Sequence, residues 1–326
     1  MASSHHPFRF AVRSSQISSG RELRERARQA EDLGYYAYHV TDHVLGPGEA
    51  MARAGHPGTS LAVVPALMAL ADATDHLRCG ARVICLDYHH PVVLAKEMAT
   101  IDLLSEGRLE VSLGAGWLAS EYQALGIPFD PAPERIDRLA EAVKLMKALF
   151  GDGQVSFHGK HFQVEGFEGS PKPAQRPHPP IVIGGGARRM LQLAGREADI
   201  VSINYDTRSG VVGPEGVQGS TAESTLRKIQ WIREGAGDRF DQIQIDIGIY
   251  FTVVTDDAAN ITEQMGTKFG LTARDMIEHP HALIGSPDSI CEELVRRRET
   301  YGISYVAISA DRAAAFAPVV EQLAGN

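Results

Sequence analysis

The sequence predicts an α/β protein folded as a (β/α)8 TIM barrel with insertions. Strand-like and helix-like segments alternate along the 326 residues, which implies a parallel sheet with right-handed crossovers. Eight strands are expected, and eight is the number that closes a barrel. A doubly wound open sheet is the structural alternative. Its Gly-x-Gly-x-x-Gly fingerprint does not follow the first strand, where residues 13–16 read Arg-Ser-Ser-Gln.

Short β-prone runs predict the first four strands, at residues 8–13, 36–40, 77–86 and 108–113. The helix after the first strand is charged and ends at Gly34, a typical C-terminal glycine. Residues 61–73 form the next predicted helix. Pro91 opens the third, because proline is preorganised for the first helical position. The fourth spans residues 133–150, where apolar residues recur at helical spacing.

The second half of the chain continues the alternation. Strands are predicted at residues 180–183, 199–203, 243–254 and 304–309, and helices at 188–196, 221–234, 287–301 and 313–323. Three segments interrupt the rhythm, near residues 151–179, 206–220 and 256–282. The first predicts a hairpin and a proline-rich extended segment, and the second, which is rich in glycine, predicts a loop. We therefore expect one domain over residues 1–326 that carries these insertions.

Composition excludes several classes of protein. With 44% hydrophobic and 22% charged residues the chain is typical of globular proteins, and its net charge of −9 argues against a nucleic-acid partner. No apolar stretch approaches the roughly 18 residues that a membrane span needs. The three cysteines form no Cys-x-x-Cys pair, and the N-terminus resembles no secretory leader. A cytoplasmic protein without membrane contact is expected.

Candidate catalytic residues follow the second predicted strand, because the active sites of TIM barrels lie at the carboxyl ends of the strands. Asp42 and His43 form a titratable pair at this position. A histidine here can act as a general acid or base near neutral pH, with a carboxylate that fixes its tautomer. The alternative is that Asp42 caps a turn and His43 is merely solvated.

Two glycine-rich loops are candidate binding segments. Glycines at strand ends let a ligand approach the backbone closely, and the second loop leads into a helix N-terminus, which favours anions. Arginines in that first helical turn oppose the helix dipole unless a phosphate neutralises them. The alternative is a tight turn with solvated arginines. The residues concerned are Gly114, Ala115, Gly116 and Trp117 after the fourth strand, and Gly184, Gly185, Gly186, Ala187 and Arg188 after the fifth.

No metal site is predicted. His89 and His90 are adjacent, so both cannot comfortably face one metal on an extended backbone. His279 and His281 give an equally weak signal. The motifs of zinc peptidases, P-loop proteins and serine hydrolases do not occur.

Taken together and in order, the motifs resemble those of the bacterial luciferase-like flavin and deazaflavin oxidoreductases. The resemblance rests on residues 34 and 41–43, 80–84 with 90–97, 107–117, 179–186 and 194–199, and covers nearly the whole chain. It implies a TIM barrel, usually dimeric, that holds coenzyme F420 or FMN at its C-terminal face. By position, Asp42 and His43 match the pair near the cofactor ring, and Arg82 and Val83 match a bulge behind the ring that often contains a non-proline cis peptide. The two glycine-rich loops match those that hold the phosphate-bearing tail.

One departure concerns Trp117, which stands where the deazaflavin-dependent sugar-phosphate dehydrogenases carry a glutamate. Their acid–base pair and substrate therefore do not transfer directly. The expected function is hydride transfer between F420 and a small organic substrate, in a homodimer. One alternative is an FMN-dependent monooxygenase that uses oxygen and a separate reductase. A non-catalytic ligand-binding barrel is the alternative of another class.

Overall fold

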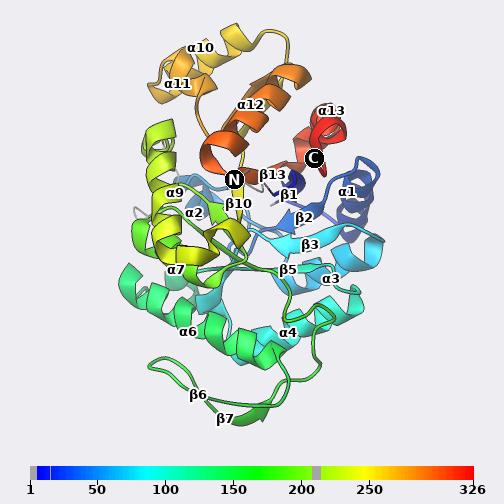
Figure 1. Cartoon of the computed structure of the whole chain (residues 1–326), viewed down its shortest axis with the longest axis vertical. Helices are drawn as coiled ribbons and strands as arrows, with labels where there is room; N and C mark the ends of the chain where they lie inside the picture. Colours follow the sequence, from blue (N-terminus) through cyan, green and yellow to red (C-terminus); the bar gives the residue numbers. More distant parts are fainter. Residues whose placement is uncertain (1–5, 15, 208–213) are drawn as a thin grey trace.

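Parallel strands close into a barrel in the computed structural model, which describes residues 6–14, 16–207 and 214–326 (Figure 1). The strands follow the order β3-β2-β1-β13-β10-β9-β8-β5 around the ring, and the pairing of β3 with β5 closes it. The predicted (β/α)8 TIM barrel is thereby confirmed. The eight strands are β1 (Arg9–Ser14), β2 (Ala37–Val40), β3 (Arg78–Ala81), β5 (Leu109–Gly114), β8 (Ile181–Gly185), β9 (Ile200–Ile203), β10 (Gln244–Gly248) and β13 (Ile303–Ser309).

Helices surround the barrel. The larger ones are α1 (Gly20–Asp32), α3 (Val63–Ala73), α4 (Pro91–Leu104), α6 (Ala132–Phe150), α7 (Arg188–Glu197), α9 (Ala222–Ala236), α10 (Ala258–Phe269), α12 (Pro287–Tyr301) and α13 (Ala313–Leu323). Shorter elements are α2 (Glu49–Arg53), α5 (Ala119–Leu125), α8 (Pro214–Gln218), α11 (Ala273–Ile277) and the 3-10 turns η1 (Leu86–Tyr88), η2 (Gly237–Gln242) and η3 (Ala310–Arg312). No helix among the described residues is long and apolar enough to cross a membrane.

Local sequence signals set several helix ends, among them the predicted ones at Gly34 and Pro91. The Ser19 side chain accepts a hydrogen bond from the Glu22 backbone N–H and caps α1, a contact that typically stabilises a helix by about 1 kcal/mol. Gly34, just beyond this helix, has φ of 77°, the left-handed conformation that favours glycine. Pro91 occupies the first position of α4. These residues fix where the helices begin and end, and the chain can then return to the next strand of the barrel.

Apolar side chains fill the space between the barrel and its helices, and polar side chains occupy much of the barrel interior. The outer core includes Leu67, Met98 and Leu139, which are 0% exposed. Inside the barrel, Glu110 accepts hydrogen bonds from the Tyr305 hydroxyl at 3.0 Å and lies 3.1 Å from the His39 ring. Buried polar groups are tolerated when they are paired in this way.

Two predicted strands are divided in the structure. The predicted strand at residues 77–86 consists of β3 and β4 (Ile84–Cys85), separated by Arg82 and Val83. The peptide bond between these two residues is cis, as the family resemblance implied. The predicted stretch at 243–254 divides into β10 and β11 (Phe251–Val254), and β11 pairs outside the barrel with β12 (Ala282–Gly285).

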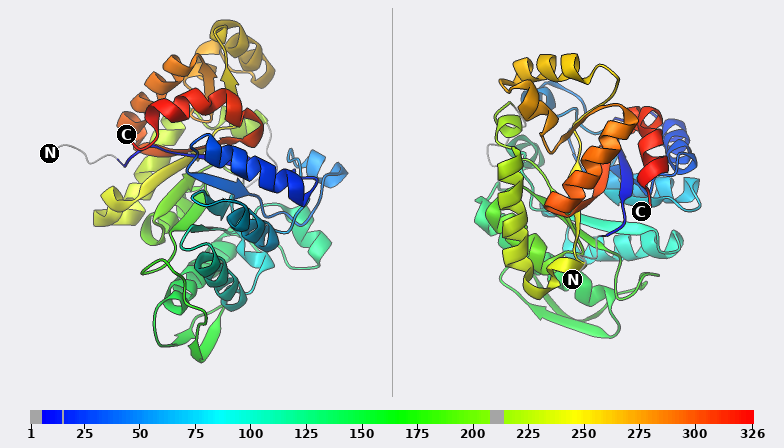
Figure 2. Two further views of the ribbon diagram at one scale, coloured as in Figure 1. Left: turned by 90° about the vertical axis from the view of Figure 1, so that its right-hand side faces the viewer. Right: turned by 45° about the horizontal axis from the view of Figure 1, so that its top comes forward.

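Two of the insertions lie at opposite ends of the molecule (Figure 2). Residues 151–179 contain the predicted hairpin, formed by β6 (Gln154–His158) and β7 (Gln163–Glu168). Of the loop predicted at 206–220, residues 208–213 lie outside the described residues, and residues 214–218 are helical rather than loop. The third insertion, residues 256–282, carries α10 and α11 at the end opposite the hairpin.

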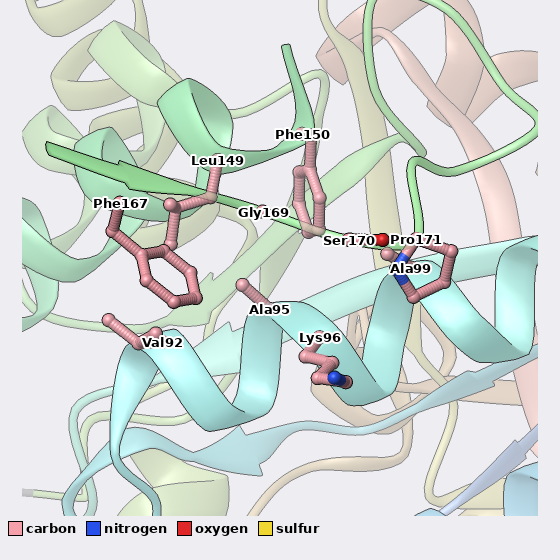
Figure 3. A pocket seen from close by; sticks show the side chains of 10 residues that line it. All are labelled: Val92, Ala95, Lys96, Ala99, Leu149, Phe150, Phe167, Gly169, Ser170 and Pro171. Carbon is pink, nitrogen blue, oxygen red and sulfur yellow. The ribbon is translucent and has the colours of Figure 1, made fainter. Parts of the chain in front are cut away.

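A small apolar pocket lies where the chain after the hairpin crosses α4 (Figure 3). Val92 and Ala95 of α4 face Phe167 of β7 there, and Ala99 lies beside Pro171. The cavity volume is about 10 Å³, which is room for about one water molecule. We therefore assign it to packing of the hairpin rather than to ligand binding.

Candidate active site

A large cavity opens at the carboxyl ends of the barrel strands. Its volume is about 390 Å³, which is within the range of small-molecule sites. The structure brings nearly all of the predicted site residues together here, and only Arg188 is missing from the lining. The predicted residues that line the cavity are Asp42, His43, Arg82, Val83, Gly114, Ala115, Gly116, Trp117, Gly184, Gly185, Gly186 and Ala187.

Asp42 and His43 do not pair with each other, which corrects the predicted Asp–His pair. His43 Nδ1 lies 2.9 Å from Glu121 Oε2, whereas Asp42 Oδ2 accepts from the Cys85 backbone N–H at 2.9 Å and lies 3.1 Å from His89 Nε2. Neighbouring side chains on an extended segment point to opposite sides, so the two residues find different partners.

Glu121, on α5, is the carboxylate that positions His43, and its side chain is only 1% exposed. Oε1 accepts from the backbone N–H groups of Val44 and Leu45 at 2.7 and 3.0 Å, and Oε2 accepts from the Tyr88 hydroxyl at 2.9 Å. Burial alone would raise the pKa of Glu121, but the hydrogen bonds, that from His43 first among them, outweigh burial and lower it. Glu121 is therefore ionised at neutral pH and accepts the Nδ1 proton of His43, which leaves Nε2 free to exchange a proton.

Sequence reasoning missed Glu121 because it lies in a helix 78 positions from its partner. One signal could have indicated it. Glu121 follows Trp117 by four residues, directly behind the predicted glycine-rich loop.

His56, which comes from the segment between β2 and α3, stacks beside His43. The ring centroids lie 4.2 Å apart, and Trp117 completes the group with its ring centroid 6.0 Å from that of His43. His56 Nδ1 accepts from the Gly58 backbone N–H at 3.1 Å, so the neutral ring carries its proton on Nε2. Burial, with smaller contributions from the neighbouring charges of His43 and Arg13, lowers the pKa of His56 to about 3.

The low pKa of His56 predicts that the protein loses stability as the pH falls below about 6.5. Between the ordinary value of 6.5 and the folded value of about 3, the unfolded chain binds a proton that the folded chain does not. One such proton gives a slope of about 1.4 kcal/mol per pH unit. His56→Gln should therefore reduce the pH dependence of the melting temperature between pH 6.5 and 4.5, a range that lies within this window. His76→Gln, on an exposed histidine, is the control. An unchanged slope in the His56 variant would contradict the prediction.

Arg82 and Val83 lie at the floor of the cavity, but their side chains point in different directions. Arg82 donates to Asp246 at 2.5 Å and to the Ser202 hydroxyl at 2.9 Å, so its charge is neutralised within the barrel. Val83 lies between the strand ends of β5 and β8. A Cβ added at Gly114 or Gly184 would meet Val83 at 2.5 or 3.1 Å.

The glycines of both loops line the cavity and are also required by the protein's own packing. A Cβ at Gly116, whose φ is +73°, would lie 1.8 Å from the Tyr122 hydroxyl. A Cβ at Gly185 would lie 2.4 Å from Met190 Cγ, and one at Gly186 would lie 2.2 Å from a backbone oxygen. Loss of ligand binding on substitution here would therefore not separate a binding role from a packing role.

Arg188 does not line the cavity, and the argument that a phosphate must neutralise it is wrong. Its side chain is 62% exposed and lies 3.1 Å from Glu234 of α9. Arg189 lies 2.5 Å from Asp137 of α6. Carboxylates on the two flanking helices thus offset the unfavourable position of the arginines at the N-terminus of α7.

Fold and cavity together define a TIM-barrel protein with a candidate ligand site at the carboxyl ends of its strands. The model of the luciferase-like monooxygenase family matches residues 2–269, so the chain belongs to this family. The family resemblance recognised in the sequence is thereby confirmed.

The relatives that the chain matches are named for two different cofactors. The chain is 32% identical over 189 residues to an FMNH(2)-dependent dimethylsulfone monooxygenase of Pseudomonas putida, covering 58% of this chain and 50% of that protein. It is also 32% identical over 206 residues to an F420-dependent glucose-6-phosphate dehydrogenase of Microbacterium testaceum, covering 63% and 57%. The chain thus spans about half the length of the curated relatives that it matches.

Solved structures share the whole fold. A coenzyme F420-dependent tetrahydromethanopterin reductase from Methanopyrus kandleri superposes with a TM-score of 0.74 at 18% identity, over 98% of this chain and 99% of that chain. A long-chain alkane monooxygenase superposes with a TM-score of 0.73 at 17% identity, over 97% and 92%. At such identities the likeness concerns the fold alone.

Proposed function

We propose that the protein is an oxidoreductase that transfers a hydride between coenzyme F420 and a small organic substrate. The observation that carries this proposal is the His43–Glu121 pair in the cavity wall. Oxidation of an alcohol by hydride loss also releases the hydroxyl proton, and a histidine backed by a buried carboxylate is suited to accept it. The F420-dependent relative adds support from sequence.

The residues of the cavity fit a flavin-like cofactor. Val83, Ala115, Ile136 and Met190 give part of the wall an apolar surface, as a planar ring requires. Ala187 begins α7 at the rim and provides no capping side chain, so the first-turn N–H groups are available to a phosphate of the cofactor tail. When bound, the cofactor supplies the hydride chemistry, and the protein supplies binding, orientation and electrostatics.

His43 and Glu121 divide the work of proton transfer. His43 Nε2 takes the proton of a substrate hydroxyl during oxidation and returns it in the reverse direction. Glu121 stabilises the imidazolium that forms, and its bond to Nδ1 holds the ring in one orientation. The Tyr88 hydroxyl and the backbone N–H groups of Val44 and Leu45 fix the carboxylate itself.

The second candidate is an FMN-dependent monooxygenase that receives reduced flavin from a separate reductase. The dimethylsulfone monooxygenase relative favours it. Titration of the purified chain with F420 and with FMN, followed by cofactor fluorescence, tests both. The first proposal expects micromolar or tighter binding of F420. Binding of FMN with none of F420 would overturn it in favour of the monooxygenase, and binding of neither would favour the non-catalytic barrel.

A homodimer is also proposed. α4 buries Leu94, Met98 and Ile101 against its own barrel, and yet leaves Val93 and Leu104 56% and 61% exposed. Packing of α4 against its own barrel requires only one apolar face, and this helix has apolar residues on two. We expect light scattering to give a dimer whose interface buries more than about 1,200 Å². A monomer mass of 35.3 kDa at micromolar concentration would refute this expectation.

A further inference from the structure

Among the described residues, three arginines line the cavity, and two of them have their hydrogen-bond donors satisfied by the protein. Arg82 is neutralised by Asp246 and also donates to Ser202. Arg135 donates through Nε, Nη1 and Nη2 to three backbone carbonyl groups, among them that of Ala115 at 3.1 Å. The positions of both side chains are therefore explained by their partners within the protein.

Arg13, at the end of β1, lacks such partners among the described residues. Its closest acceptor is the Ile249 carbonyl, at a long 3.4 Å from Nη2. Its Nε is buried and has no hydrogen-bond partner among the described residues. No described carboxylate lies within 4.0 Å of it, although a guanidinium carries five N–H donors. The side chain thus brings an uncompensated positive charge to the cavity, which is costly unless a ligand offsets it.

The neighbouring side chains orient the guanidinium of Arg13 so that it can bind a planar group. Its Cζ lies 4.7 Å from the centroid of the Tyr250 ring, and the Tyr250 hydroxyl donates to Asn204 Oδ1 at 2.7 Å. A cation held over an anchored aromatic ring loses little freedom when it binds an anion. Burial, together with the positive charge of Arg82, lowers the pKa of Arg13. An anion would relieve both effects.

Arg13 also lines the same cavity as the proposed proton-transfer group. It is near enough to His56 for its charge to contribute to lowering the pKa of that ring. His56 is in turn 4.2 Å from His43, measured between ring centroids. A ligand held by Arg13 would therefore share the cavity with these two histidines.

We propose that Arg13 binds an anionic group of the substrate, so that the enzyme acts on small molecules that carry an oxyanion such as a carboxylate, sulfonate or phosphate. The inference rests on the proposed oxidoreductase function and names the substrate class of the same site. The fork of the guanidinium matches two oxygens of such a group, which gives strong, oriented hydrogen bonds. Arg13 would hold the anion while the reacting carbon lies beside His43.

The test uses the full chain without cofactor, and three probes: acetate, methanesulfonate and inorganic phosphate. Tryptophan fluorescence reports binding at constant ionic strength, because Trp117 lies in the same cavity. We expect saturable binding of at least one probe, and the preferred probe identifies the oxyanion. Arg13→Gln should weaken that binding at least tenfold. Arg13→Lys should bind with intermediate affinity, because it keeps the charge but loses the fork.

Arg227→Gln is the matched control, because Arg227 lies on the outer surface of α9 and pairs with Glu223 at 2.5 Å. It should bind the probes as the unchanged chain does. Thermal melts of both Arg13 variants show whether they fold. The proposal is overturned if no probe binds saturably or if Arg13→Gln binds the probes normally. It is also overturned if Arg13→Gln loses affinity for F420 or FMN as strongly as for the probes, since Arg13 would then contact the cofactor.

The two proposals fail in different ways. If neither cofactor binds, the oxidoreductase proposal fails, and the probe titrations still show whether Arg13 is an anion site. If a cofactor binds and the probes do not, the oxidoreductase proposal stands and the anionic substrate class is rejected.

Discussion

Replacement of His43 by alanine is expected to slow turnover about 100-fold or more while F420 binding stays nearly unchanged. This is the usual scale for loss of a general acid or base. His43 Nδ1 is held by Glu121, so Nε2 is the atom left to exchange a proton with the substrate. The assay follows F420 reduction with a panel of small alcohols and hydroxy acids, and uses the best substrate of the unchanged chain.

His76→Ala is the control for this experiment, since His76 is exposed and remote from the cavity lining. It should turn over at the normal rate. If His43→Ala also turned over normally, His43 would be only a packing residue beside His56 and Trp117. If the variant lost cofactor binding, its role would be structural rather than catalytic.

Glu121→Gln is expected to cause a loss of turnover of similar size, although Glu121 is a positioning residue that acts through His43. The carboxylate accepts from four donors, namely His43, Val44, Leu45 and Tyr88. A glutamine amide has a nitrogen that must face at least one of these donors, and a buried donor left unpaired costs about 1–3 kcal/mol. We therefore expect a lower melting temperature and a displaced His43.

A double-mutant cycle separates positioning from general destabilisation. If Glu121 acts through His43, the variant that carries both His43→Ala and Glu121→Gln should be no slower than His43→Ala alone. Tyr88→Phe removes a single donor to Glu121 and should have a smaller effect on turnover. Independent, multiplicative losses in the double variant would contradict the positioning role.

The ionisation of Glu121 also predicts how the stability of the folded protein changes at acidic pH. Its pKa is lowered in the folded protein, so the unfolded chain takes up the proton first as the pH falls. The stability that Glu121 contributes is complete above its ordinary value of 4.5 and is lost as the pH falls through the folded value. This loss overlaps the lower part of the window in which His56 titrates, between pH 4.5 and about 3. Glu121→Gln should remove it and should also lower the pKa of His56 further, because the charge of Glu121 raises that pKa.

The sequence by itself determined the barrel and the edge on which the cavity lies. Each strand is short and bounded by turn residues, each main helix has its own period and end signals, and these are local properties. Once the strands are parallel, their carboxyl ends must meet at one face. That is why Asp42, Val83, Gly114 and Gly184 could be placed together without coordinates.

Only the tertiary structure decided which of these residues interact. Glu121, His56 and Arg13 come from three different segments, and no local pattern links them to His43. The same holds for Arg188, which meets Glu234 across 46 positions, and for Gly185, where a Cβ would lie 2.4 Å from Met190 Cγ. Pairing between distant side chains depends on where the packed helices and loops bring them. A hydrogen bond forms only within about 3 Å, a distance that sequence periodicity does not specify.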